Sequence, residues 1–156
     1  MRISTATLDD AATLASLIGA FRDHLGARRP DDEELARYLP TALASDALEF
    51  HIAWLDDRPA GYAQTRFFPS VWSAGVDAHL EDLYVCEWAR RREVGRALLR
   101  HVEAVAAERG AVRLTLTTNQ GNETAQALYR TQGWAPESHA LYPGGSEVLW
   151  VRRLGT

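Results

Sequence analysis

Apolar residues recur along the chain with two different periods, and the two periods predict alternating strands and helices. A spacing of three to four predicts helices over residues 11–25, 31–45, 94–110 and 123–133. Alternating positions and short apolar runs predict strands over residues 3–7, 47–55, 61–68, 76–85, 111–119, 138–143 and 146–154. In the second helix, Pro40 should break or kink the chain. The buried stripe of the first helix is predicted to consist of Leu14, Leu17, Ile18, Phe21 and Leu25.

The order of these elements predicts the fold class. A strand and two helices precede three strands, which are followed by a helix, a strand, a helix and two further strands. This order predicts a mixed α/β fold, with a mixed central sheet of about six to seven strands flanked by about four helices. The strands before and after the third helix should run parallel. A length of 156 residues fits a single domain over residues 1–156.

The strand that precedes the third helix changes parity in its middle. Its apolar residues hold even positions up to Leu80 and odd positions from Leu83 onward. A regular strand cannot keep both sets on one face, so a β-bulge is expected near Glu81 and Asp82. Such a bulge would turn Glu81, or both acidic residues, toward the same cleft as Tyr84. A charge pair on an edge strand explains the pattern equally well.

Three consecutive arginines, Arg90 to Arg92, stand just before the third helix. A helix N-terminus has unpaired N–H groups and a partial positive charge, so cations are poorly placed there unless an anion binds. Gly95 allows close approach of the backbone, and guanidinium groups supply forked donors, so a pyrophosphate site is expected. A solvated basic patch, paired with acids such as Glu87 and Glu93, is the competing interpretation. The chain has neither G-x-x-x-x-G-K-[ST] nor G-x-G-x-x-G, which weakens the NTPase and dinucleotide interpretations.

Composition narrows the class of protein further. The formal net charge of −4 argues against a nucleic-acid partner, and no apolar run is long enough to cross a bilayer, so a membrane partner is not expected either. Cys86 is the single cysteine, which excludes an intramolecular disulfide. The first residues do not resemble a signal peptide. We therefore expect a cytoplasmic protein, and we expect no metal.

Two segments of the chain resemble the GNAT superfamily of acyl-CoA-dependent N-acetyltransferases. LEDLYVCEWARRREVGRALL is similar to the family's bulged strand followed by [QR]-x-x-G-x-[GA] at a helix start. NQGNETAQALYRTQGW is similar to its second segment, a helix ending in Tyr before Gly and an aromatic residue. The resemblance covers nearly the whole order of elements and implies a GNAT-like sheet with a bulged central strand. In the preferred alignment Glu93 stands at the first glycine of the motif, and an alternative alignment from Arg92 to Ala97 displaces the helix start.

By this resemblance, acetyl-CoA is the co-substrate. The central strand would pair with the pantetheine arm like an added strand. The arginine-rich turn would hold the pyrophosphate, and the start of the fourth helix would contact the cofactor arm. The cofactor-binding residues implied in this way are Leu83, Tyr84, Val85, Arg90, Arg91, Arg92, Val94, Gly95, Arg96, Ala97 and Asn122.

The reaction implied by the resemblance is direct attack of a primary amine on the thioester. A lysine-like amine has a pKa of about 10.4, so a base or a desolvated site must remove its proton. Glu81, acting through water, is the first candidate base, followed by Asp82 and His79. A backbone N–H near Leu83 would stabilise the oxyanion. Tyr129 matches the family's general acid for the thiolate leaving group.

Acceptor binding is expected from the first two helices, the loop before the central strand and the last hairpin. Aromatic faces there would attract a cationic amine, and plain core packing is the alternative for each residue. The acceptor implied by the resemblance is a small-molecule or peptide amine. The candidate residues are Phe21, His24, Phe68, Trp72, His79 and Tyr142. A non-catalytic acyl-CoA-binding regulatory module is the alternative function, which Glu93 in the glycine position favours, and a homodimer is a further expectation.

Overall fold

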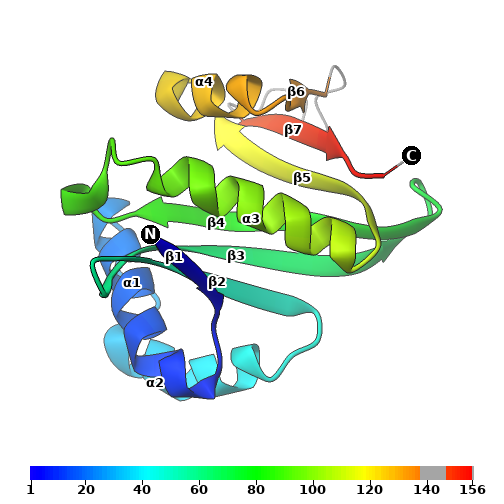
Figure 1. The fold of residues 1–156 in the computed structure, drawn as a ribbon. Coiled ribbons are helices and arrows are strands. Elements are labelled where there is room, and N and C mark those ends of the chain that lie inside the picture. Colours follow the sequence, from blue (N-terminus) through cyan, green and yellow to red (C-terminus); the bar gives the residue numbers. More distant parts are fainter. Residues whose placement is uncertain (138–146, 156) are drawn as a thin grey trace. The chain divides into compact units, whose positions relative to one another are not determined.

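The computed structural model describes residues 1–137 and 147–155, and its elements follow the predicted order (Figure 1). They are β1 (Arg2–Thr5), η1 (Leu8–Asp10), α1 (Ala11–His24), α2 (Asp32–Leu43), β2 (Leu48–Leu55), β3 (Arg58–Ser70), β4 (Gly75–Val85), η2 (Glu87–Ala89), α3 (Val94–Glu108), β5 (Ala111–Asn119), α4 (Glu123–Thr131), β6 (Ala135–Pro136) and β7 (Glu147–Arg153). Among the described residues, seven strands form a mixed sheet in the order β1-β2-β3-β4-β5-β7-β6. The predicted fold class is confirmed.

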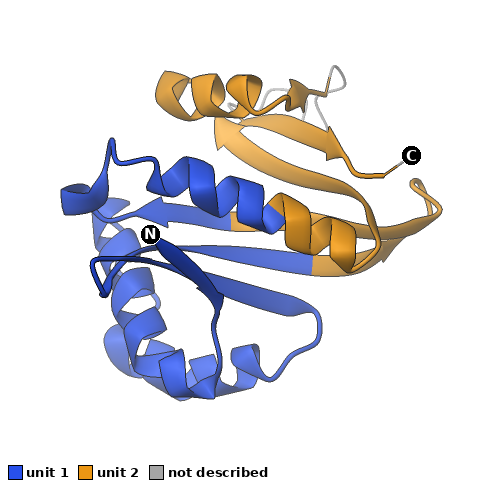
Figure 2. Cartoon of the chain, viewed as in Figure 1, with its two compact units in different colours: residues 1–66, 82–102 blue, residues 67–81, 103–156 orange. Residues whose placement is uncertain are grey.

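The chain divides into two compact units (Figure 2). Unit 1 consists of residues 1–66 and 82–102, and unit 2 consists of residues 67–81 and 103–156. Strands β3 and β4 and helix α3 each contribute residues to both units. This division does not test the expectation of a single domain, which stays a prediction.

In unit 1, helices α1 and α2 share a hydrophobic core with one face of β2. Helix α2 begins in a capping box, because Asp31 accepts a hydrogen bond from the Glu34 N–H (2.8 Å) and Glu34 accepts one from the Asp31 N–H (2.9 Å). The opposite face of β2 carries His51, whose ring lies 4.7 Å from that of His101 on α3. The buried members of the shared core are Leu14, Leu17, Leu35, Leu39, Ala42, Phe50, Ile52, Tyr62 and Tyr84.

Two expectations about the first two helices are wrong. Helix α2 runs through Pro40 to Leu43 without a break. Proline removes one backbone donor, but Leu39 and Ala42 on either side of it are buried, and this packing keeps the last turn helical. Leu25 is 63% exposed, because α1 ends at His24 and Leu25 is already its C-cap.

In unit 2, β4 and β5 are parallel, as predicted, and β5 pairs with β7 in antiparallel register. Trp150 of β7 is fully buried against Tyr129 of α4. The predicted first strand of the last hairpin, residues 138–143, lies outside the described residues. Among the described residues, β7 also pairs with the short strand β6.

The register of β4 bears on the predicted bulge. Its pairing with β5 shifts between Val76 and Asp77, earlier along the strand than the sequence pattern indicates. The register covers Val76 to His79, so the bulge expected near Glu81 stays a prediction. Burial along the second half of the strand does not follow the apolar pattern, because Tyr84 is buried, while Leu83 and Val85 are only half-buried.

Candidate functional site

The turn before α3 has an unusual backbone. Arg91 and Glu93 both have positive φ, 61° and 64°, in the left-handed region that favours glycine. Helix α3 begins immediately afterwards at Val94, and its first described backbone hydrogen bond runs from Ala97 N–H to Glu93 C=O (3.0 Å). The N–H groups of Val94, Gly95 and Arg96 therefore precede the helical ladder and are available to an anion. This geometry supports the alignment that puts Glu93 at the motif's first glycine.

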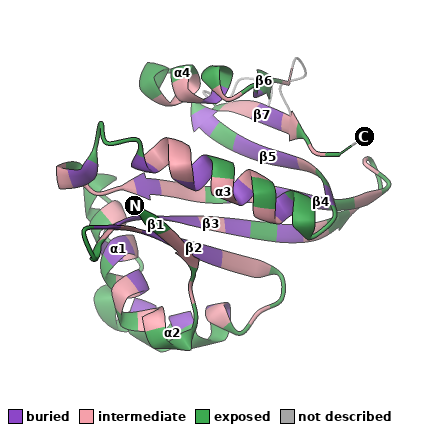
Figure 3. Ribbon diagram, viewed as in Figure 1, coloured by how far each residue is buried: buried purple, intermediate pink, exposed green. Residues whose placement is uncertain are grey.

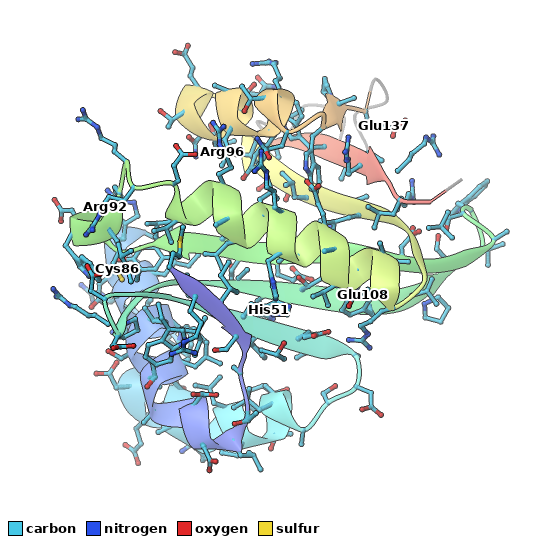
Figure 4. The ribbon with its side chains drawn as sticks, in the orientation of Figure 1. His51, Cys86, Arg92, Arg96, Glu108 and Glu137 are labelled. Atoms are coloured by element: carbon cyan, nitrogen blue, oxygen red, sulfur yellow. The ribbon has the colours of Figure 1, made fainter. Side chains whose placement is uncertain are left out.

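Three arginines at this turn, among them Arg92 and Arg96 (Figure 4), each contact a neighbouring residue. Arg90 Nε donates to Val85 C=O at 3.3 Å, which ties the turn to the end of β4. Arg92 lies 3.6 Å from Asp56 of the β2–β3 turn, and Arg96 lies 3.1 Å from Glu93. These two ion pairs therefore agree in part with the competing interpretation, a basic patch paired with acids. Both guanidinium groups nevertheless keep more than a third of their side-chain surface exposed, 49% for Arg92 and 39% for Arg96.

The strand end that leads into this turn packs tightly on β3. Cys86 N–H donates to Ala60 C=O at 2.9 Å. A Cβ atom on Gly61 would lie 2.3 Å from the Tyr84 carbonyl oxygen, so only glycine allows this approach. The predicted cofactor-binding residues Leu83, Tyr84 and Val85 thus lie at the end of β4, which packs against β3 on one side. Burial raises the pKa of the Cys86 thiol, which makes it a weak nucleophile.

Asp82 lies in an aromatic cluster of unit 1. Its Oδ2 accepts a hydrogen bond from the Tyr62 hydroxyl at 3.1 Å. Tyr84 stacks on Phe21 with centroids 5.2 Å apart, and Tyr62 and His24 each lie 6.3 Å from Tyr84. Burial strongly raises the pKa of Tyr62, so its hydroxyl stays protonated and remains a donor. The structure therefore brings three predicted residues, Asp82, Phe21 and His24, to one place.

Glu81 and His79 belong to unit 2. Glu81 is exposed, whereas His79 is half-buried and its Nδ1 lies 2.7 Å from Thr115 Oγ1 of β5. In a strand, residues two apart share a face, so the predicted proximity of these two side chains is reasonable. The contact with Thr115 gives His79 a structural partner, and its place as a candidate base stays a prediction.

Tyr129 is 7% exposed on α4 and packs against two indoles, with centroid distances of 6.1 Å to Trp134 and 5.8 Å to Trp150. Burial raises the pKa of its phenol above the usual value of 10.0. The predicted helix cap at Asn122 is confirmed, because its side chain accepts a hydrogen bond from the Ala125 N–H at 3.1 Å. That bond uses the side-chain carbonyl oxygen, and the contact of Asn122 with the cofactor arm stays a prediction.

The structure does not place Trp72 beside Glu81. Trp72 lies at the tip of the β3–β4 hairpin, before β4 begins at Gly75, and is 96% exposed. Glu81 is six residues further along the strand, a span of roughly 20 Å. The predicted contribution of Trp72 to acceptor binding stays a prediction. Phe68 is half-buried in unit 2, and Tyr142 lies outside the described residues.

Three contributors were missed from the sequence. Tyr62 holds Asp82, Thr115 holds His79, and Asp56 pairs with Arg92. Tyr62 and Thr115 lie in strands whose sequence pattern is typical of ordinary core. Their contacts with Asp82 and His79 depend on strand register, which the sequence does not show. The Asp56-Asp57 turn carried a detectable signal, because acidic residues tolerate the positive φ of 53° and 57° that both adopt.

The residues that the structure describes contain no group of three or more metal-ligating side chains, and none of their helices is long and apolar enough to cross a membrane.

Comparisons with known proteins agree with the geometry. A family model described as the acetyltransferase (GNAT) family matches residues 14–134. The thialysine N-epsilon-acetyltransferase of Caenorhabditis elegans is 30% identical over 129 residues, which cover 83% of this chain and 79% of that protein. A crystal structure of a probable acetyltransferase is 32% identical, with a TM-score of 0.84 over 91% of this chain and 95% of the other.

A more distant likeness concerns the fold alone. The PaiA N-acetyltransferase of Thermoplasma acidophilum, solved in complex with coenzyme A, is 17% identical, with a TM-score of 0.72 over 98% of this chain and 99% of that one. The family model covers most of the chain, from Leu14 within α1 to Trp134, three residues after α4. With the motif turn before α3 and the Tyr129 helix in place, this chain belongs to the acetyltransferase (GNAT) family.

Proposed function

We propose that this protein is an acetyl-CoA-dependent N-acetyltransferase that transfers the acetyl group directly to a primary amine. The observation that carries the proposal is the left-handed backbone of Arg91 and Glu93 at the N-terminus of α3. Two such unfavourable backbone conformations within three residues cost of order 1–3 kcal/mol each, and a folded protein retains them where the resulting geometry has a use. Here the use is a row of N–H groups turned toward an anionic ligand.

The residues of unit 1 fit the cofactor's chemistry. The N–H groups of Val94, Gly95 and Arg96 suit a pyrophosphate, and Arg90 and Arg91 add exposed positive charge. The coenzyme A complex of the distant PaiA relative supports the same ligand class. Leu83 to Val85 offer backbone groups to an extended pantetheine arm.

The aromatic cluster suits a cationic acceptor. Asp82 carries a carboxylate fixed by Tyr62, and the rings of Tyr84 and Phe21 stand beside it. A carboxylate next to aromatic faces favours an ammonium group over a neutral or anionic one. The name of the Caenorhabditis elegans relative specifies thialysine, so thialysine and other small diamino compounds head our list of acceptors.

When bound, acetyl-CoA would supply a thioester carbonyl open to attack by the amine. Glu81 or Asp82 takes the ammonium proton, with Glu81 acting through water. The phenol of Tyr129 stays protonated at neutral pH, because burial raises its pKa, and it donates its proton to the departing thiolate.

A thiol-release assay with a panel of amines tests this function. The purified protein should release free thiol from acetyl-CoA only when an amine is present, with diamines ahead of carboxylic acids and neutral alcohols. Separate Glu81→Gln and Asp82→Asn variants identify the base. The variant that lacks the true base should lose most of its activity at the acid end of the pH range. Absence of acceptor-dependent thiol release from every amine would contradict the proposal.

The alternative is a non-catalytic acyl-CoA-binding regulatory module. Glu93 favours it, because its carboxylate stands beside the phosphate position and pairs with Arg96. A thermal-shift scan with acetyl-CoA, combined with the thiol-release assay, separates the enzyme from the non-catalytic module. Ligand at one hundred times Kd adds about 2.7 kcal/mol of stability. Stabilisation by acetyl-CoA without turnover would favour the module.

A further inference from the structure

The turn that follows α4 is held by two side chains from other elements of unit 2. Trp134, which is buried, donates its indole N–H to Oε1 of Glu103 on α3 at 2.6 Å. The guanidinium of Arg152 on β7 donates to the Gly133 carbonyl at 3.0 Å. Its Nε also lies 3.9 Å from Oε2 of Glu103. The Glu103 carboxylate therefore links the turn after α4 to both α3 and β7.

The charge of Glu103 is largely removed from water, because its side chain is only 16% exposed. Burial of a carboxylate costs free energy, and a buried ion pair is weak evidence for stability. A hydrogen bond to a carboxylate is, however, short and directional. Glu103 therefore fixes the position of the Trp134 ring more than it adds to the stability of the fold.

Trp134 in turn contacts Tyr129 in two ways. Its backbone N–H donates to the Tyr129 carbonyl at 3.0 Å, and the centroids of the two rings are 6.1 Å apart. Trp150 of β7, which is fully buried, lies 5.8 Å from the same phenol ring. The phenol of Tyr129 is therefore packed against two indoles, and the position of one of them depends on Glu103.

We propose that Glu103 is a positioning residue for the phenol of Tyr129. The inference rests on the proposed function, in which this phenol protonates the departing thiolate. A proton donor must lie within hydrogen-bond distance of its acceptor, and a displacement of about 1 Å can cost roughly a hundredfold in rate. Without the Glu103 oxygen, the indole N–H of Trp134 loses its acceptor, its ring can rotate, and the phenol is no longer held in place.

Turnover of matched variants tests this inference. Glu103→Leu removes the acceptor and should lower kcat about tenfold, with the Kd of acetyl-CoA unchanged. Glu103→Gln keeps an acceptor oxygen for the indole and should retain most of the turnover. Glu108→Leu is the control, because it makes the same change on the same helix and should leave kcat unchanged. Glu108 (Figure 4) belongs to residues 107–110, which are exposed at the end of α3 and just beyond it (Figure 3).

A double variant separates positioning from a general loss of structure. If Glu103 acts through the phenol, Glu103→Leu should have no further effect on kcat in a Tyr129→Phe protein, because no proton donor is left to misplace. The same fold-loss of kcat with and without the Tyr129 hydroxyl would overturn the inference. A folded Glu103→Leu protein with the kcat of the wild type would overturn it as well.

Two further measurements keep the test decisive. If Glu103→Leu fails to fold, Trp134→Phe removes the indole donor, keeps an aromatic ring and carries the same expectations. Exchange of the Trp134 indole proton, followed by NMR, needs no turnover. It should be slow in the wild type and faster in Glu103→Gln, whose acceptor is uncharged, and rapid exchange in the wild type would overturn the inference.

Failure of the proposed function has a different signature in the same series. A wild-type protein that releases no thiol with any amine would contradict the proposed function itself, and this inference with it. A Tyr129→Phe protein with the kcat of the wild type would contradict the assigned proton donor. Loss of the inference alone requires an active wild type, a slow Tyr129→Phe variant and an unaffected Glu103→Leu variant.

Discussion

The hydroxyl of Tyr62 donates a hydrogen bond to Oδ2 of Asp82 across 3.1 Å, and this bond fixes a carboxylate beside the stacked rings of Tyr84 and Phe21. A donor to a carboxylate stabilises the ionised form. Tyr62→Phe removes this donor and should therefore shift the acid limb of the rate profile to higher pH. The specificity constant for cationic amines should fall about tenfold.

The pH profile of kcat/KM measures this effect, and Tyr38→Phe, a change of the same kind on exposed helix surface, is its control. An unchanged acid limb in Tyr62→Phe would show that Asp82 does not touch the acceptor or its proton.

The strained residue Glu93 leads to a second prediction. Glycine adopts a φ of 64° without cost, whereas a residue with a Cβ loses about 1 kcal/mol there. Glu93→Gly should therefore raise the free energy of unfolding by about 1 kcal/mol. The ion pair with Arg96 that it removes is exposed and contributes little.

Glu93→Ala separates the backbone from the charge in this prediction, because alanine removes the carboxylate and keeps the strain. In urea unfolding, the Glu93→Gly variant should have a higher free energy of unfolding than the Glu93→Ala variant. Acetyl-CoA should bind both variants at least as tightly as the wild type. Weaker cofactor binding by Glu93→Gly would mean that the carboxylate itself helps to hold the ligand.

Tyr129→Phe tests the general acid. The ring keeps its packing against Trp134 and Trp150, so the melting temperature should stay within a degree or two of the wild type. Loss of the proton donor should lower kcat by about a hundredfold, with little change in the Kd of acetyl-CoA. Equal losses in kcat and in cofactor affinity would assign Tyr129 a binding role instead.

The buried His51, whose ring lies beside that of the half-buried His101, predicts acid sensitivity. Burial, and then repulsion from His101, lowers the pKa of His51 from 6.5 to about 4, while Glu49 opposes the shift. Between these two pH values the unfolded chain binds more protons than the folded chain. The free energy of unfolding should therefore fall as pH drops from 6.5 to about 4, by up to roughly 3 kcal/mol, and stay level above 6.5 as far as this group is concerned.

Urea titrations across this range measure the slope, and His51→Gln should flatten it. A wild-type stability that is constant between pH 6.5 and 4 would contradict the account of this pair.

Local pattern was sufficient for most of the fold. Apolar periodicity located α1, α3 and the central strands, and the Asn122 cap and the Gly133 stop, with its φ of 82°, followed from known helix-end preferences. The arginine turn was found because its charges oppose the helix dipole. The motif alignment already put Glu93 at the first glycine position, and its positive φ supports that alignment.

The remaining features depend on contacts between segments far apart in sequence. Helix α2 tolerates Pro40 because of tertiary burial, which local propensity does not include. The hydrogen bond between Tyr62 and Asp82 depends on strand register. A shift of one residue would abolish this hydrogen bond, because it turns the side chains of a strand to the opposite face of the sheet. Trp72 was assigned to a pocket by residue type, although its place at a hairpin tip puts it far along the strand from Glu81.

The most direct test of the central claim is mass spectrometry of both enzyme and amine in one reaction. The protein is incubated with acetyl-CoA first without and then with thialysine or another diamine. Direct transfer predicts that the enzyme keeps its unmodified mass in both samples, including at Cys86, and that the amine gains one acetyl group on nitrogen. An acetylated enzyme that forms without the amine and passes its acetyl group on, or an amine that stays unmodified across the whole panel, would contradict the account.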